Sequence, residues 1–314
     1  MMEWAIESLK KLESSRRDRA NKPAPLPGSS EAEVLLKTYH PDYLGNKRQL
    51  SVGPNAGDQK VPLELAQLLE GDSSIDNLPN PEIQTDVLII GGGGAGAAAA
   101  LTLEGSGLDV HLATKLRLGD SNTVMAEGGI QSALGPEDSP RRHFADALVG
   151  GHGDNDPNLL KILCEQGPES IRWLSQLGCL FDQNEKGRFR LRGGGGTSVP
   201  RVLACRDYTG LEIMRVLKDA VRLTSTKLME EHVAMELVDD GNGRVTGAIL
   251  FDRSASKTVC ISARAVILAT GGSGQIRLQG FPTSNHIGAT GDGLVLAYRQ
   301  GCRLIDLDSY QYHP

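Results

Sequence analysis

The feature that most constrains the fold is a glycine-rich turn between a short apolar run and an alanine-rich segment. The apolar run covers 86–90, and residues 91–96 read Gly-Gly-Gly-Gly-Ala-Gly. A short apolar run bounded by turn residues predicts a buried parallel strand, and the alanines over 97–103 predict a helix. A second strand is expected over 109–114. The sequence therefore predicts a strand–turn–helix–strand unit of about 30 residues.

Within this turn, Gly91, Gly93 and Gly96 form the pattern G-x-G-x-x-G. Gly91 allows a tight turn, Gly93 lets a diphosphate approach the backbone, and Gly96 lets the helix pack against the strand. The first turn of the helix then offers free N–H groups and a positive dipole end to the phosphates. Because the motif follows a predicted strand and opens a predicted helix, it indicates a dinucleotide site.

The end of the second strand departs from the nicotinamide-dependent pattern. An acidic residue usually holds the ribose hydroxyls there, whereas this chain has Thr114 and Lys115. A dehydrogenase that uses only a nicotinamide cofactor is therefore disfavoured, and an FAD site stays open.

The rest of the chain predicts an α/β fold. A helix is expected over 211–223, and Gly241-Asn242-Gly243 predicts a hairpin turn between strands over 234–238 and 245–250. A β-meander continues through 258–261, and 265–270 is a further buried strand. We expect a Rossmann-like domain whose parallel sheet is left for a β-meander insertion and then re-entered.

Residues 1–80 differ from the remainder and are interpreted as an irregular and helical N-terminal extension, followed by the main domain over 81–314. An amphipathic helix is expected over 1–22 and a short packed helix over 63–69. Two interpretations stay open for the extension: it wraps another domain or a partner, or it is a partly disordered tail.

Composition excludes several classes of function. Lys and Arg total 33 against 39 Asp and Glu, a net charge of −6, and aromatic residues make up 4%, so nucleic-acid binding is not expected. The sequence has no apolar run of about 18 residues, so no membrane span is expected. The five cysteines lie far apart, so neither a metal site nor an iron–sulfur cluster is expected, and reduced thiols favour a cytoplasmic location.

Five motifs occur in a fixed order: 91–96, Ala126-Glu127-Gly128-Gly129-Ile130, Ala269-Thr270-Gly271-Gly272, Thr290-Gly291-Asp292-Gly293 and Gln311-Tyr312-His313-Pro314. Over 85–314 the series resembles the flavoprotein subunit of the succinate dehydrogenase/fumarate reductase family, which has L-aspartate oxidase and adenylylsulfate reductase as relatives. The resemblance implies FAD bound in an extended form by a Rossmann-like domain, followed by the start of a capping domain.

The resemblance also assigns cofactor-binding positions along the chain. They comprise the diphosphate loop, the strand end near the adenosine ribose, the loop under the isoalloxazine ring, a backbone contact to adenine, the far side of the diphosphate and a carboxylate near the flavin. In that order the residues are Gly91, Gly92, Gly93, Gly94, Ala95, Gly96; Thr114, Lys115; Ser121, Asn122, Thr123, Ala126, Glu127, Gly128, Gly129; Val233, Ala234; Thr270, Gly271; and Asp292.

Asn122 is an informative departure from the family pattern. Membrane-bound respiratory members carry a histidine here that is bonded covalently to the flavin. Because asparagine cannot form that bond, the resemblance implies non-covalent FAD, which favours fumarate reduction or oxidase chemistry over succinate oxidation.

Two candidate catalytic residues follow from the same resemblance. His313 matches the family histidine that contacts a substrate carboxylate. Arg201 has two interpretations, a guanidinium that clamps a carboxylate or an arginine at the surface or capping the core. His286 is expected near the flavin, whereas His111, His143, His152 and His232 are expected to be structural or exposed.

The resemblance implies hydride transfer between FAD and a dicarboxylate such as fumarate or succinate, with a separate iron–sulfur subunit as electron partner and membrane association only through partners. Alternatives are an L-aspartate oxidase-like enzyme and a non-catalytic flavin-binding fragment that uses the N-terminal extension for docking. The chain is expected to be part of a subunit about twice as long, and to turn over little alone.

Overall fold

The computed structural model describes residues 29–30, 34, 47–58, 60–71, 80–278 and 282–310. The expected helix over 1–22 and His313 lie outside these residues. In chain order the elements are β1 (Lys47–Arg48), β2 (Val61–Pro62), α3 (Leu63–Glu70), β3 (Ile83–Ile90), α4 (Gly94–Leu103), β4 (Val110–Ala113), the 3-10 helix η2 (Asn122–Met125), β5 (Ile130–Gln131), α5 (Pro140–Gly150), α6 (Pro157–Gln176), β6 (Val202–Leu203), α7 (Thr209–Arg222), β7 (Lys227–Met229), β8 (His232–Asp239), β9 (Val245–Asp252), β10 (Lys257–Leu268) and α8 (Asp292–Arg299).

The centre of the fold is a six-stranded sheet in the order β7-β4-β3-β10-β9-β8. The strands β7, β4, β3 and β10 are parallel, and β9 and β8 extend the sheet with antiparallel pairing. The α/β prediction and the predicted β3–α4–β4 unit are confirmed.

The meander differs from the expectation in one respect. The expected strands over 258–261 and 265–270 are a single strand, β10, whose first half pairs with β9 and whose second half pairs with β3. The chain leaves the parallel part of the sheet after β7 and returns to it through the second half of β10, so the expected meander insertion is present and continues the same sheet at its edge.

Both faces of the sheet are buried, which explains the continuous apolar run of β3. Val87 and Ile89 face a core that α4, α6 and α7 cover, while Leu88 and Ile90 face a second core that includes Leu296 of α8. This alternation follows from the two-residue period of a strand.

Two helices begin at a side-chain cap. Ser139 accepts a hydrogen bond from the Arg142 N–H at the start of α5, and Asp156 accepts two at the start of α6. Helices α3, α4, α7 and α8 have no such cap. In α4 the N-cap residue is Gly93, so no side chain at that position stands between the first turn and a ligand, while the Gly94 N–H donates to the Thr123 hydroxyl at 3.2 Å.

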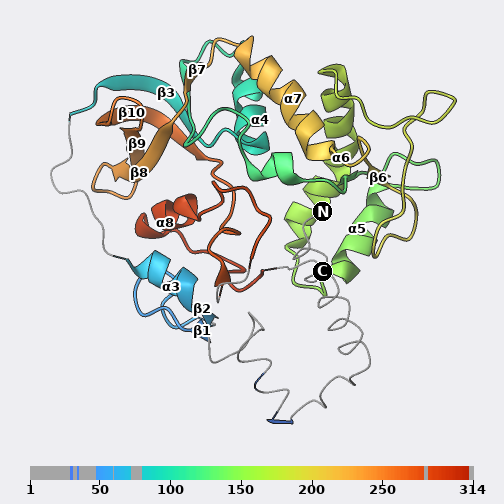
Figure 1. Ribbon diagram of the computed structural model, residues 1–314, viewed down its shortest axis with the longest axis horizontal. Helices are drawn as coiled ribbons and strands as arrows, with labels where there is room; N and C mark the ends of the chain where they lie inside the picture. Colours follow the sequence, from blue (N-terminus) through green and yellow to red (C-terminus); the bar gives the residue numbers. More distant parts are fainter. Residues whose placement is uncertain are drawn as a thin grey trace, which may run out of the picture.

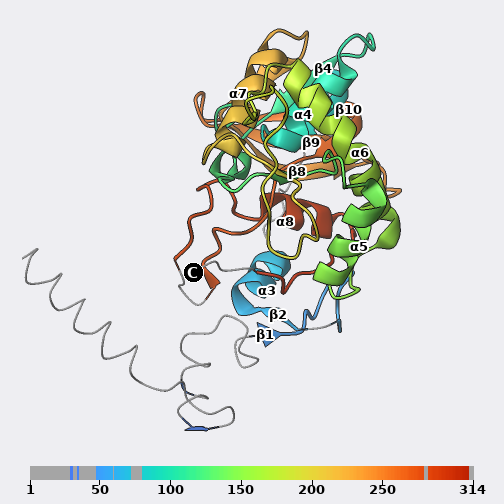
Figure 2. The ribbon, with the colours of Figure 1, turned by 90° about the vertical axis from the view of Figure 1, so that its right-hand side faces the viewer.

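The N-terminal unit, which we define as residues 47–58 and 60–71, packs on the far side of α8. Figures 1 and 2 show α8 between the sheet and α3. Leu65 and Leu69 of this unit share a buried cluster with Tyr298 of α8. These residues therefore pack on α8. Within the described part of the chain, no helix has the length and apolar character needed to cross a bilayer.

Candidate functional site: a dinucleotide cavity

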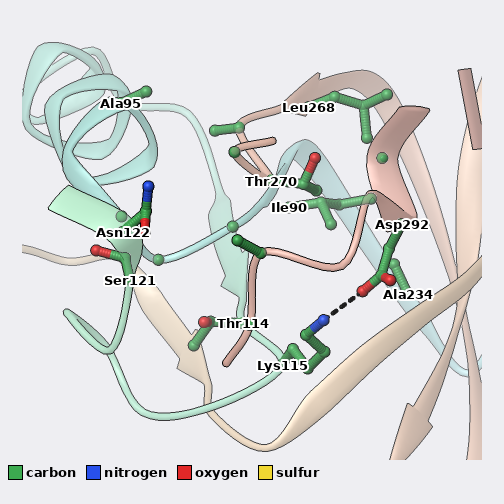
Figure 3. A pocket seen from close by; sticks show the side chains of 18 of the residues that line it. Ile90, Ala95, Thr114, Lys115, Ser121, Asn122, Ala234, Leu268, Thr270 and Asp292 are labelled. Carbon is green, nitrogen blue, oxygen red and sulfur yellow. Dashed lines mark hydrogen bonds and ion pairs between the residues drawn. The ribbon is translucent and has the colours of Figure 1, made fainter. Parts of the chain in front are cut away.

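A cavity of about 410 Å³ lies at the carboxyl ends of the parallel strands β3, β4 and β10 (Figure 3). Ligands of open α/β sheets bind at this edge. The predicted cofactor residues that line it are Gly91, Gly92, Gly93, Gly94, Ala95, Thr114, Lys115, Ser121, Asn122, Thr123, Ala234, Thr270, Gly271 and Asp292.

The glycine-rich turn has the close backbone packing that a diphosphate loop requires. A Cβ atom at Gly96 would lie 1.8 Å from the Gly91 carbonyl oxygen, and one at Gly91 would lie 2.2 Å from the Ala269 carbonyl oxygen. Gly91 also has a φ of 120°, which disfavours any residue with a side chain. The residues present therefore fit a dinucleotide, because the turn and the open N-terminus of α4 face the cavity.

One end of the cavity carries an ion pair. The Lys115 Nζ lies 2.6 Å from the Asp292 Oδ2 and also donates to the Thr290 hydroxyl at 2.6 Å. Figure 3 shows Lys115, from the end of β4, reaching across to Asp292, the first residue of α8. A carboxylate is favourable at a helix N-terminus. Lys115 and Asp292 thus join the parallel half of the sheet to α8. Asp292, expected near the flavin, therefore lies at the same end as Lys115, which was expected near the adenosine ribose.

The other end of the cavity is closed by amide hydrogen bonds. Asn122 Nδ2 donates to the Asn285 side-chain oxygen at 2.8 Å, and Asn122 Oδ1 accepts from the His286 N–H at 2.9 Å. Asn122 is exposed, and Figure 3 shows it beside Ser121 and Ala95 at the end remote from Lys115. Both polar groups of Asn122 therefore hold the loop before α8 against the start of η2.

The remaining predicted cofactor residues do not line this cavity. Gly96 packs beneath the turn, and Val233 lines a neighbouring cavity. The exposed loop 126–129 is held to α7, because the Gly210 N–H donates to the Ala126 carbonyl at 2.7 Å. These residues therefore lie next to the cavity and not in its wall.

Arg201 occupies a different place from the one expected for a substrate clamp. Its side chain is fully buried, forms two 3.0 Å hydrogen bonds to Asp138 and lies 2.8 Å from Asp146. Nearby, burial and the Arg201 charge lower the pKa of His143. The guanidinium is thus engaged by the chain's own carboxylates. This arrangement fits the core-capping interpretation, and Arg201 does not line the cavity; its role as a substrate clamp stays a prediction.

Two histidines contribute to the cavity wall. His286 lines the cavity, where the sequence placed it near the flavin. His232, expected to be structural or exposed, also lines it, with Nδ1 lying 2.6 Å from the Glu230 carbonyl oxygen. Sequence reasoning missed the cavity role of His232, and also of Ile90, Ala113 and Leu268 at the strand ends. Their positions at the carboxyl ends of parallel strands were the available signal. Among the described residues, no group of three or more His, Cys, Asp or Glu is placed to hold a metal ion.

Comparison with known proteins agrees with this geometry. Residues 86–314 match the family described as FAD binding domain, which defines the chain as an FAD-binding flavoprotein. It is 43% identical to an uncharacterised FAD-dependent oxidoreductase of Methanocaldococcus jannaschii, over 74% of this chain and 42% of the relative. It is 38% identical to L-aspartate oxidase of Streptomyces coelicolor, over 75% of this chain and 41% of that enzyme.

The fold is similar to that of quinol fumarate reductase of E. coli, with a TM-score of 0.64 and 30% identity over 68% of this chain and 37% of that one. The chain belongs to the FAD-binding flavoprotein family that includes fumarate reductase, succinate dehydrogenase and L-aspartate oxidase. It spans about two fifths of the length of the curated relatives cited here.

Proposed function

We propose that this chain is the FAD-holding part of an oxidoreductase that transfers hydride between non-covalently bound FAD and a dicarboxylate. FAD supplies the two-electron chemistry when it is bound. The observation that carries the proposal is the glycine turn at the open N-terminus of α4, which faces a cavity with a charged end and an amide end.

The residues of the cavity have separate roles in this proposal. Backbone N–H groups of the turn bind the diphosphate, apart from that of Gly94, which donates to the Thr123 hydroxyl, and Lys115 holds the ribose side of the nucleotide. Asn122 positions the loop that carries His286 beside the flavin. An asparagine amide is not a nucleophile at neutral pH, so Asn122 supports non-covalent binding. His313 is proposed to contact a substrate carboxylate.

Fumarate or succinate is the proposed substrate, with electrons exchanged through a separate iron–sulfur subunit. The likeness to quinol fumarate reductase supports this assignment. A cytoplasmic location is also proposed, with membrane association only through partners, because all five cysteines are free thiols. The boundary between an N-terminal extension and a domain that starts near 81 is part of the same proposal.

A second candidate is an L-aspartate oxidase-like enzyme, which the 38% identity to the Streptomyces enzyme supports. Activity separates the two. The gene product that contains this chain, purified with FAD, is assayed with fumarate and a reduced viologen dye, and separately with L-aspartate and oxygen. Turnover of fumarate alone supports the first proposal, and turnover of L-aspartate supports the second. Retention of FAD with neither activity favours a non-catalytic flavin-binding role.

A further inference from the structure

The N-terminal unit lies outside the part of the chain that matches the family. That match begins at residue 86, whereas the unit comprises residues 47–58 and 60–71. The unit nevertheless packs directly on α8, the helix whose first residue, Asp292, lines the cofactor cavity.

Buried hydrogen bonds fix the position of this unit. Asn55 is 5% exposed, and its amide group both donates to the Leu304 carbonyl and accepts from the Leu304 N–H, each at 2.8 Å. The Tyr298 hydroxyl donates to the Val52 carbonyl at 2.6 Å. A buried polar side chain that is fully paired specifies one arrangement. The unit is thus a defined part of the described structure.

Helix α3 of this unit lies beside the cofactor site. A second, more open cavity of about 450 Å³ shares Lys115, Ala234, Asp292 and Leu296 with the first. Gln67 and Leu68 of α3 line this second cavity. The Lys115–Asp292 ion pair therefore lies in the wall that the two cavities share.

The direction of a bound dinucleotide follows from the sheet. A bound dinucleotide would have its diphosphate at the glycine turn and its adenosine ribose by the end of the second strand, β4, which leads to Thr114 and Lys115. The adenine ring, which continues beyond that ribose, would then be directed toward the second cavity. There Val233 and Ala234 line one part of the wall and α3 lines another.

We propose that α3 forms a wall of the adenosine end of the FAD site, so that a unit outside the family domain sets affinity for the nucleotide half of the cofactor. This inference rests on the FAD site proposed above. Leu68 is half-buried: it packs on the cluster shared with α8, and the part that lines the second cavity offers an apolar surface to a flat adenine ring, while Gln67 is exposed and offers an amide to polar atoms.

The test measures dissociation constants of FAD, ADP and FMN for the purified chain and two variants by isothermal titration. Leu68→Trp fills the second cavity. Leu63→Trp makes the same substitution on α3 at a half-buried position that lines neither cavity, and serves as the matched control. We expect L68W to raise the dissociation constants of FAD and ADP by the same factor, tenfold or more, and to change the dissociation constant of FMN by less than twofold. L63W should change none of them beyond twofold.

Equal affinity of L68W and the unchanged chain for FAD and ADP would overturn the inference. If L68W does not fold, as judged by circular dichroism, Gln67→Ala and Leu68→Ala replace it, with an expected two- to fivefold loss for FAD and ADP, and no loss in either variant overturns the inference. If the unchanged chain binds FAD no better than FMN and does not bind ADP, the inference fails while the flavin site stands. If it binds no flavin, the proposed function itself fails.

Discussion

The two ends of the dinucleotide cavity are closed in different ways. At one end, Lys115 and Asp292 form an ion pair, backed by α8 and the buried cluster of the N-terminal unit. At the other end, the exposed Asn122 holds residues 285–286 through two amide hydrogen bonds. The charged end rests on packed helices, whereas the amide end is a rim on loops.

This difference indicates that the two ends of the cavity have different roles. A packed wall with a cation suits the part of the cofactor that only needs to be held. A loop rim suits the end where, in the proposed function, substrate enters and product leaves. The comparison therefore assigns affinity mainly to the Lys115 end and access mainly to the Asn122 end.

The largest expected effect comes from the turn between the two ends. In Gly96→Ala, the added Cβ would lie 1.8 Å from the Gly91 carbonyl oxygen, so the turn must deform. We expect the variant to retain no FAD after desalting, measured by absorbance near 450 nm. Gly150→Ala, whose Cβ meets no atom within 4 Å, is the control and should retain FAD as the unchanged chain does. FAD retention by G96A equal to that of G150A would contradict this account of the turn.

The next largest effect is expected from removing the ion pair at the charged end alone. Lys115→Met leaves the Asp292 carboxylate without its partner where an anionic cofactor must bind, so FAD should bind about tenfold more weakly, about 1.4 kcal/mol. Lys115→Met with Asp292→Asn removes the repulsion and should recover part of the loss. Titration of FAD fluorescence measures both. A double variant that binds more weakly than K115M would show that the pair has another role.

A smaller effect is expected from removing the hydrogen bonds at the amide end. Asn122→Ala removes both hydrogen bonds to residues 285–286, but the side chain is exposed, so we expect FAD affinity to fall by about threefold, since an exposed hydrogen bond contributes about 0.5–1.5 kcal/mol. The KM for the substrate should rise by a larger factor than the dissociation constant for FAD. If N122A weakens FAD more than K115M does, the division of tasks between the two ends is wrong.

The smallest effect concerns the wall behind the charged end. Glu70 at the end of α3 accepts hydrogen bonds from Arg48 and from the N–H and hydroxyl of Ser51, which lower the pKa of Glu70 from 4.5 to about 2. Because the folded pKa is depressed, this stabilisation is full above pH 4.5 and is lost as pH falls toward 2. Glu70→Gln should therefore lower the melting temperature by a few degrees at pH 7, since about 1 kcal/mol shifts a melting point by about 2–4 °C in a chain of this size. The difference from the unchanged chain should shrink in melts below pH 4.5. A difference that is constant from pH 7 to pH 3 would contradict the assignment.

Much of the site could be predicted from local sequence. The glycine turn and the strands beside it lie within about 30 residues, and the pattern G-x-G-x-x-G reports their shared geometry. The single strand β10 is harder to predict, because the polar Arg264 stands between its two apolar runs. Arg264 is exposed and pairs with Asp86, so its polarity reflects the surface of a strand and not a break in it.

Long-range partners could not be read from sequence in the same way. Arg201 pairs with the carboxylates of Asp138 and Asp146. Both lie more than 50 residues before Arg201 in the sequence, and no local pattern links them to it. The cavity role of His232 depends on how β8 approaches β4, which is a tertiary contact. The part that α3 has in the second cavity likewise depends on a tertiary contact, its packing on α8.

The most direct test of the central claim is a visible spectrum of the purified chain after incubation with FAD and desalting, repeated on the supernatant after acid precipitation. The account predicts that flavin is retained and that acid releases it into the supernatant, as a non-covalent site with Asn122 requires. Flavin that stays in the acid pellet would contradict non-covalent binding, and a chain that retains no flavin would contradict the site itself.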